Sequence, residues 1–217
     1  MHLTREQLGI ELDQQVFNFL QAGGLRFTPF RSAPDMVTEW ILPILALLRE
    51  RHVRIEVEDG NVPGLIVWPL RLADRIALCG HHGKLGHSLA RVQLKHEFEA
   101  DRPHLCLDVH DGRGRINYRR EEVESRLKVS PLTLGEGLSL LSLEPQRFVT
   151  HGLWCLGTCE NVDQRAACLC MNRSGEIEAE LRTFSTSPNK ALPMGVATCR
   201  LRLHDASAIK SKAAAVA

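Results

Sequence analysis

Residues 40–58 have the sequence WILPILALLRERHVRIEVE, and the spacing of their apolar side chains changes along this stretch. As far as Leu48 the apolar residues form the wide stripe of a buried helix face, in which Pro43 should introduce a kink. From Val53 onward apolar and charged residues alternate, which is typical of a half-buried strand. The stretch therefore predicts a helix followed by a strand, and a fold that combines both kinds of element.

A helical hairpin is expected in the N-terminal part of the chain. Residues 4–7 (TREQ) have the form of a capping box, and apolar residues then recur at helical spacing until Gly23 and Gly24. A second helix should begin near residues 32–35, where Pro34 in the first turn costs no hydrogen bond. We expect the two helices to pack together and to cover another layer of the fold.

Strand patterns dominate the rest of the chain. Strands are expected at residues 65–68, 105–109, 153–157, 166–171, 177–181 and 196–203, with a hairpin turn at 172–175. In the last of these strands Arg200 and Arg202 alternate with leucines, which is the pattern of an exposed strand face. A helical pattern returns in residues 119–145, where Thr133 and Glu136 form a second capping box.

These patterns predict an α+β fold. An N-terminal helical hairpin should pack on a mixed or antiparallel sheet, with a helical insertion near residues 119–145. No linker, repeat or low-complexity block divides the chain, so residues 1–205 are expected to form a single domain. Residues 206–217 lack a periodic apolar face and are expected to be a disordered tail.

The composition excludes several classes of protein. The 217 residues include 27 Lys and Arg against 26 Asp and Glu, and a net charge of +1 argues against a general nucleic-acid binder. The longest apolar stretch, Trp40–Leu48, is too short to span a bilayer, and residues 1–6 do not resemble a signal peptide. Seven cysteines are too few for a disulfide-dense scaffold. We expect a cytoplasmic protein that contacts neither nucleic acid nor membrane.

The most pointed chemical feature is a group of four cysteines, namely Cys155, Cys159, Cys168 and Cys170. Four thiolates can hold a tetrahedral zinc ion when the turns or strand ends that carry them converge. The spacing here is C-x3-C followed by C-x-C, whereas zinc ribbons and knuckles prefer C-x2-C pairs. The alternative is that these residues are small, buried side chains of core strands, which the spacing favours.

A second candidate metal site is the segment CGHHGKLGH at residues 79–87, with His81, His82 and His87 as ligands and Cys79 as a fourth. Its backbone N–H groups and Lys84 are alternatively suited to cradle an anion. The segment lacks the glycine order of a P-loop or of a dinucleotide-binding fold. A solvated, glycine-rich loop is the simpler interpretation.

Asp108, His110 and Asp111 lie close together where a strand is expected to end, a position where catalytic groups are often found. Together with the loop at residues 81–87, they are the basis for a third hypothesis, a small hydrolase or transferase. No G-x-S-x-G motif supplies a nucleophile, and aspartate is also frequent in strand-end turns for structural reasons.

Several segments together resemble a bacterial domain family of unknown function. The most specific is Ser-Pro-Leu-Thr-x-x-Glu-Gly at residues 130–137; others are LDQQV at 12–16, the stretch 102–109 with GRIN at 114–117, and GVATC at 195–199. The resemblance covers patches of residues 10–203. The family is richer in Trp and Gly than residues 165–193 are here, and the four cysteines do not match its pattern. The resemblance implies a compact bacterial domain and transfers no catalytic residue.

We therefore predict a non-enzymatic binding domain that acts on a protein or small ligand and that can form a homo-oligomer. No constellation in the sequence places a nucleophile beside a base. A zinc protein that uses the cysteine or histidine group is the first alternative, and the hydrolase or transferase is the second.

Overall fold

The computed structural model describes residues 2–50, 55–79, 83–85, 102–113, 129–160, 165–171, 177–183 and 193–203. The helices are α1 (Arg5–Gln21), η1 (Gly24–Phe27), α2 (Ala33–Met36), the π-helical turn η2 (Val37–Ile41), α3 (Leu42–Glu50), α4 (Leu72–Leu78), α7 (Leu134–Leu143) and η4 (Pro145–Val149). The strands are β1 (His2–Leu3), β2 (Ile55–Glu56), β3 (Val62–Val67), β4 (Gly83–Leu85), β5 (His104–His110), β6 (Ser130–Pro131), β7 (Gly152–Glu160), β8 (Arg165–Met171), β9 (Ile177–Thr183), β10 (Met194–Val196) and β11 (Thr198–Leu203). The α+β class expected from the sequence is confirmed.

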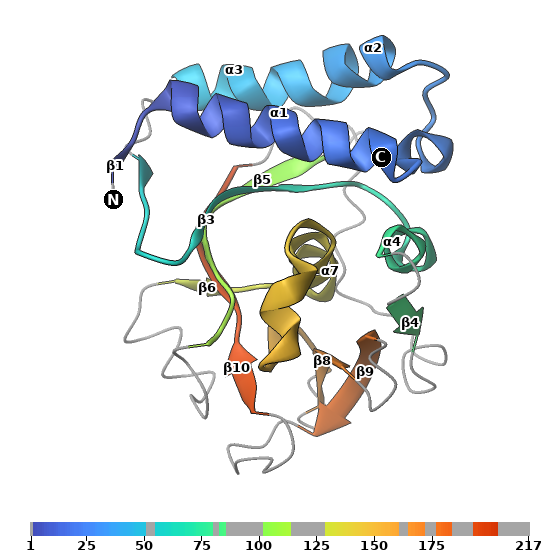
Figure 1. The fold of residues 1–217 in the computed structure, drawn as a ribbon, viewed down its shortest axis with the longest axis vertical. Coiled ribbons are helices and arrows are strands. Elements are labelled where there is room, and N and C mark those ends of the chain that lie inside the picture. Colours follow the sequence, from blue (N-terminus) through green and yellow to red (C-terminus); the bar gives the residue numbers. More distant parts are fainter. Residues whose placement is uncertain are drawn as a thin grey trace, which may run out of the picture.

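The predicted helical hairpin forms the outer layer, with α1 and α3 side by side (Figure 1). The capping box of α1 is present, because the Gln7 N–H donates to Thr4 Oγ1 at 3.2 Å and the Thr4 N–H donates to Gln7 Oε1 at 2.9 Å. Ser32 caps α2, with Pro34 in its first turn as expected. Just before Pro43 the chain takes the wide π-helical turn η2, a common way to accommodate a ring that clashes with the preceding turn.

This helical layer packs on one face of an antiparallel sheet with the order β3-β5-β11-β6. Its core joins buried side chains of the helices to alternate residues of the strands, including Leu12, Trp40, Ile66, Leu105 and Leu203. Side chains of successive strand residues point to opposite faces, so the other face of this sheet is available to a second layer.

Helix α7 supplies that second layer and lies between two sheets (Figure 1). Thr133 caps it, and the predicted capping box with Glu136 is confirmed. Seven of its ten residues are buried, so the segment is the centre of the molecule rather than a peripheral insertion. Glycine permits this close packing, because a Cβ on Gly137 would lie 2.6 Å from Cys155 Sγ.

A second sheet, with the order β10-β7-β8-β9-β4, covers the far side of α7. Its central strands β7, β8 and β9 are antiparallel, whereas β10 joins β7 and β4 joins β9 in parallel. The strand expected at residues 196–203 is in fact two strands: Val196 ends β10 in this sheet, and Thr198 begins β11 in the first. Ala197 therefore connects the two sheets.

Several expectations fall outside the described residues, namely a helix early in 119–145, the hairpin turn at 172–175 and the tail at 206–217. Within the described part of the chain, no helix is both long and apolar enough to cross a membrane.

The packing of α7 makes Gly137 a sensitive position. We expect Gly137→Ala to lower the free energy of unfolding by about 1–2 kcal/mol, because overpacking against Cys155 outweighs the gain in helix propensity. Gly9→Ala in α1 is the matched control: a Cβ there meets nothing within 4 Å, so stability should rise by up to about 1 kcal/mol. Urea unfolding measures both changes.

Adding Cys155→Ala to Gly137→Ala should recover part of the loss, since it removes the sulfur that the new methyl group meets. If the losses in unfolding free energy of Gly137→Ala and Cys155→Ala simply added up in the double variant, that result would contradict this packing.

Candidate functional site

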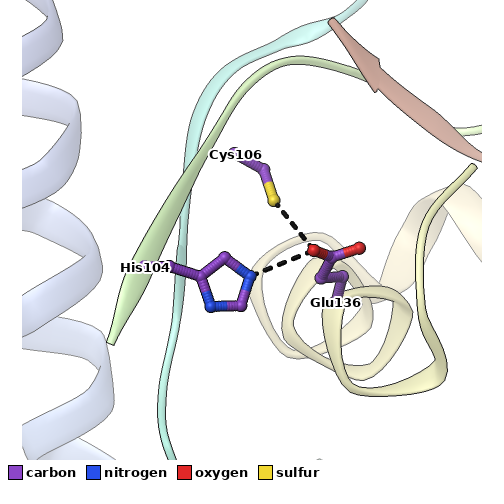
Figure 2. A group of neighbouring side chains, drawn as sticks. All are labelled: His104, Cys106 and Glu136. Atoms are coloured by element: carbon purple, nitrogen blue, oxygen red, sulfur yellow. Dashed lines mark hydrogen bonds and ion pairs between the residues drawn. The ribbon is translucent and has the colours of Figure 1, made fainter. Parts of the chain in front are cut away.

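A buried polar cluster lies between the first sheet and α7. His104 and Cys106 are two residues apart on β5, so their side chains point to the same face of the sheet, toward α7. Arg202 on β11 lies directly opposite Cys106 in the strand register. Glu136, in the first turn of α7, meets them from the other side (Figure 2).

Hydrogen bonds hold both oxygens of the Glu136 carboxylate. Oε1 accepts from Arg202 Nε at 2.6 Å, from His104 Nε2 at 3.0 Å and from the Cys106 thiol at 3.4 Å. Oε2 accepts from Arg202 Nη2 at 2.7 Å and from the Thr133 N–H at 2.7 Å. Since an ionised carboxylate only accepts, His104 presents its Nε2–H here. The buried charge is thus matched by a bidentate arginine and by three further donors.

These contacts set the ionisation of the cluster. Burial alone would raise the pKa of Glu136, but the hydrogen bonds and charges of Arg202 and His104 outweigh it and hold the pKa far below its usual range. Burial raises the pKa of the Cys106 thiol well above its usual value, and the neighbouring Cys199 thiol and Glu136 charge act in the same direction. Cys106 is therefore a neutral hydrogen-bond donor rather than a nucleophilic thiolate.

A cavity of about 360 Å³ opens beside this cluster. Its polar lining comes from Arg75, His104, Ser130, Thr133, Glu136 and Arg202. The guanidinium of Arg75 lies against α7, where a Cβ on Gly135 would come 2.0 Å from Nη1, and the Arg75 Nε donates to the Leu70 carbonyl at 2.8 Å. Among the described residues that line the cavity, Arg75 and Arg202 thus supply two cationic side chains and Glu136 the one carboxylate.

His104, Cys106 and Glu136 have the donor types that zinc accepts, and one ligand atom from each lies within 4.8 Å of the others. Arg202, however, already binds both oxygens of Glu136. A divalent cation would have to displace this guanidinium or lie beside its charge, either of which is unfavourable. The cluster therefore fits an internal ion pair better than a metal centre.

No protein-family model, curated protein or solved structure matches this chain. The resemblance to a bacterial family stays a prediction, and the site is interpreted from its own geometry.

The predicted cysteine group does not converge on one point where the structure describes it. Cys155 packs with α7, whereas Cys168 belongs to a separate cluster with Trp154, its partner in the strand register. The two sulfur atoms thus lie on opposite faces of the second sheet. Cys170 is buried on β8, and the side chain of Cys159 lies outside the described residues. This placement agrees with the alternative of buried core thiols.

The other candidate residues have different outcomes. His81, His82 and His87 lie outside the described residues, so their metal hypothesis stays a prediction. Asp108 has a positive φ of 52° and accepts from Asn61 and the Glu58 N–H while pairing with Arg200.

Asp111 and His110 serve the turn that follows β5. Asp111 accepts from the Arg113 N–H and pairs with Arg147, and His110 Nδ1 accepts from the Gly112 N–H. The Asp108 carboxylate bonds to Asn61, Glu58 and Arg200 instead of to Asp111 or His110. The contacts of the three residues therefore support the interpretation that they stabilise the strand end and its turn.

Sequence reasoning missed the central pair of the site. The alternating pattern placed Arg202 on an exposed face, which is wrong: only 22% of its side chain is exposed, while the neighbouring Leu201 is 38% exposed. Glu136 was identified only as a capping residue. A capping glutamate buried in an otherwise apolar helix is the signal that a distant cation had to be present.

We expect Glu136→Gln to lower the free energy of unfolding by about 3 kcal/mol at pH 7, because it leaves the Arg202 charge without its partner. Glu56→Gln is the control, since it removes one exposed ion pair, with Arg200, and should cost less than about 1 kcal/mol.

The effect of Glu136→Gln should depend on pH. The folded pKa of Glu136 is lowered, so its stabilisation is present above the unfolded value near 4.3 and is lost as the pH falls below it. The stability gap between the wild type and the variant should therefore narrow from pH 6 to pH 3. Denaturant unfolding across this range measures the gap, and a constant difference would contradict the ion pair.

Zinc should not stabilise the protein through this cluster. We expect the Tm of reduced protein to be the same after thorough chelation and after zinc is restored, because Arg202 occupies the carboxylate. A zinc-dependent rise in Tm that Cys106→Ser abolishes would overturn this interpretation. A rise that survives Cys106→Ser would instead locate the metal in one of the other groups.

Proposed function

We propose that this protein is a binding domain for a small anionic ligand, held in the cavity at the N-terminal end of α7. The carrying observation is that two arginines, Arg75 and Arg202, line this cavity together, while Glu136, the one carboxylate among its described lining residues, is already paired with Arg202. The described lining residues therefore bring two guanidinium groups and one carboxylate to the cavity. Carboxylates and phosphate esters are the ligands whose geometry a guanidinium matches.

The first turn of α7 supports the same ligand class. Three of its early N–H groups have partners: Leu134 donates to Thr158 Oγ1, Glu136 to Thr133 Oγ1 and Gly137 to the Thr133 carbonyl. For the Gly135 N–H, the described residues contain no acceptor. Gly135 lines the cavity, and unpaired N–H groups at a helix N-terminus favour an anion.

Binding is favoured over thiol chemistry because Cys106, the thiol that contacts Glu136, is neutral. The raised pKa of Cys106 keeps its proton in place, and that proton is donated to Glu136. Buried thiols of this kind persist in a reducing compartment, which supports the proposed cytoplasmic location.

The test uses inorganic phosphate and acetate as probes. We expect each to raise the Tm in a saturable way at constant ionic strength, whereas chloride at the same ionic strength should not, because a ligand that binds only the folded state stabilises by mass action. Isothermal titration calorimetry should report one site.

Arg75→Gln should abolish this response, and Arg75→Lys should retain part of it because it keeps the charge. Arg71→Gln is the matched control: Arg71 immediately precedes α4, 89% of its side chain is exposed, and it does not line the cavity. Absence of saturable binding by either probe would refute the proposal, as would equal losses in Arg75→Gln and Arg71→Gln.

A further inference from the structure

A second, smaller cavity of about 70 Å³ lies along the same face of α7 as the first. Gly135 lines the larger cavity, while Ser139 and Ser142 line the smaller one. These residues are spaced at i, i+4 and i+7, so they follow one line along the helix surface. The remaining walls of the smaller cavity come from α1, from β3 and the residues after it, and from α4.

Of the polar side chains that line this smaller cavity, the two serines and Gln15 are engaged within the protein, and Asn18 Oδ1 accepts from Gln14 Nε2 at 2.9 Å. The Ser139 and Ser142 hydroxyls donate to the Gly135 and Leu138 carbonyls. The Gln15 amide donates to the Gly64 carbonyl and accepts from the Ile66 N–H.

What the smaller cavity offers a ligand is therefore its apolar surface. Phe19, Leu65, Trp68, Leu138 and Leu143 contribute this surface. Phe19 and Trp68 stack with their ring centroids 4.0 Å apart, which gives the cavity a stiff aromatic wall.

Arg75 lines both cavities, so the two are adjacent at its side chain. Its position against Gly135 places the cationic group at the junction between a polar chamber and an apolar one. From this arrangement we infer that the ligand is an amphiphilic anion, with its charged head beside Arg75 and Arg202 and a short hydrocarbon chain in the smaller cavity. The inference rests on the proposed function and adds the class of ligand to it.

The size of the smaller cavity limits the chain. A water-sized group needs about 10–15 Å³ of such volume, so 70 Å³ accommodates roughly five groups. A straight-chain carboxylate of about six carbons would fill the cavity and leave its head in the larger chamber. Longer chains should gain little, because the added carbons would extend into solvent.

The experiment is a calorimetric titration of the whole chain with acetate, butyrate, hexanoate and decanoate, all below their micellar concentrations. We expect affinity to rise about two- to fourfold for each added CH₂ up to hexanoate and then to level off, because only buried methylene groups contribute. The fluorescence of Trp68, which forms part of the wall, should respond to hexanoate and not to acetate.

Two substitutions separate the head from the chain. Ala22→Leu adds an apolar side chain at a residue that lines the smaller cavity, so it should abolish the dependence on chain length and leave acetate binding unchanged. Gln21→Leu, one residue away and outside the lining, is the matched control and should change neither.

The outcomes distinguish the two proposals. Saturable acetate and phosphate binding with no gain from longer chains would overturn the amphiphile and leave the anion site standing. If affinity still rises with chain length in Ala22→Leu, the hydrocarbon chain does not bind in the smaller cavity. If no carboxylate of any length binds, and phosphate does not bind either, the proposed function itself fails.

Discussion

The buried carboxylate of Glu136 is the interaction on which the arrangement of the layers depends. An unpaired charge in this position would cost several kcal/mol, so the elements around it must bring donors to both of its oxygens. Arg202 from β11 and His104 from β5 supply them across the first sheet, and the Thr133 N–H supplies one from the start of the helix. One side chain therefore caps α7 and fixes its position against the sheet.

This double role explains why α7 begins where it does. As a capping residue, Glu136 must sit in the first turn, with its carboxylate folded back toward Thr133. That geometry brings the charge to the helix N-terminus, at the side of the sheet where β5 and β11 carry polar residues among apolar ones. The Arg202 guanidinium also donates to the Pro131 carbonyl of β6, so the same ion pair ties the edge strand into the cluster.

The sequence alone predicts those elements whose signals lie within a few neighbouring residues. Both capping boxes, the two N-terminal helices and most strands are predicted by patterns a few residues long, and the structure confirms them. It does not predict contacts between residues that are far apart in the chain. Glu136 and Arg202 are 66 residues apart, and a capping glutamate in an apolar helix calls for a cation without indicating that Arg202 supplies it.

The division of residues 194–203 between two sheets has a similar cause. A run of alternating residues indicates a strand, but it does not say which partners the strand has. Gly195 lies against Gly112 so closely that a Cβ on it would come 2.1 Å from the Gly112 carbonyl oxygen. This contact between two glycines, 83 positions apart in the sequence, is set by tertiary packing and has no local signature.

The candidate site follows from the same constraint as the fold. Because Arg202 is committed to Glu136, its charge is balanced before any ligand arrives, and Arg75 is the second arginine among the described residues that line the cavity. Arg75 reaches this place because α4 packs on α7 and because Gly135 leaves room for a guanidinium on the helix surface. A larger residue at position 135 would displace Arg75 from the junction of the two cavities. The same glycine that allows the helix to be covered on this side therefore also positions the cation.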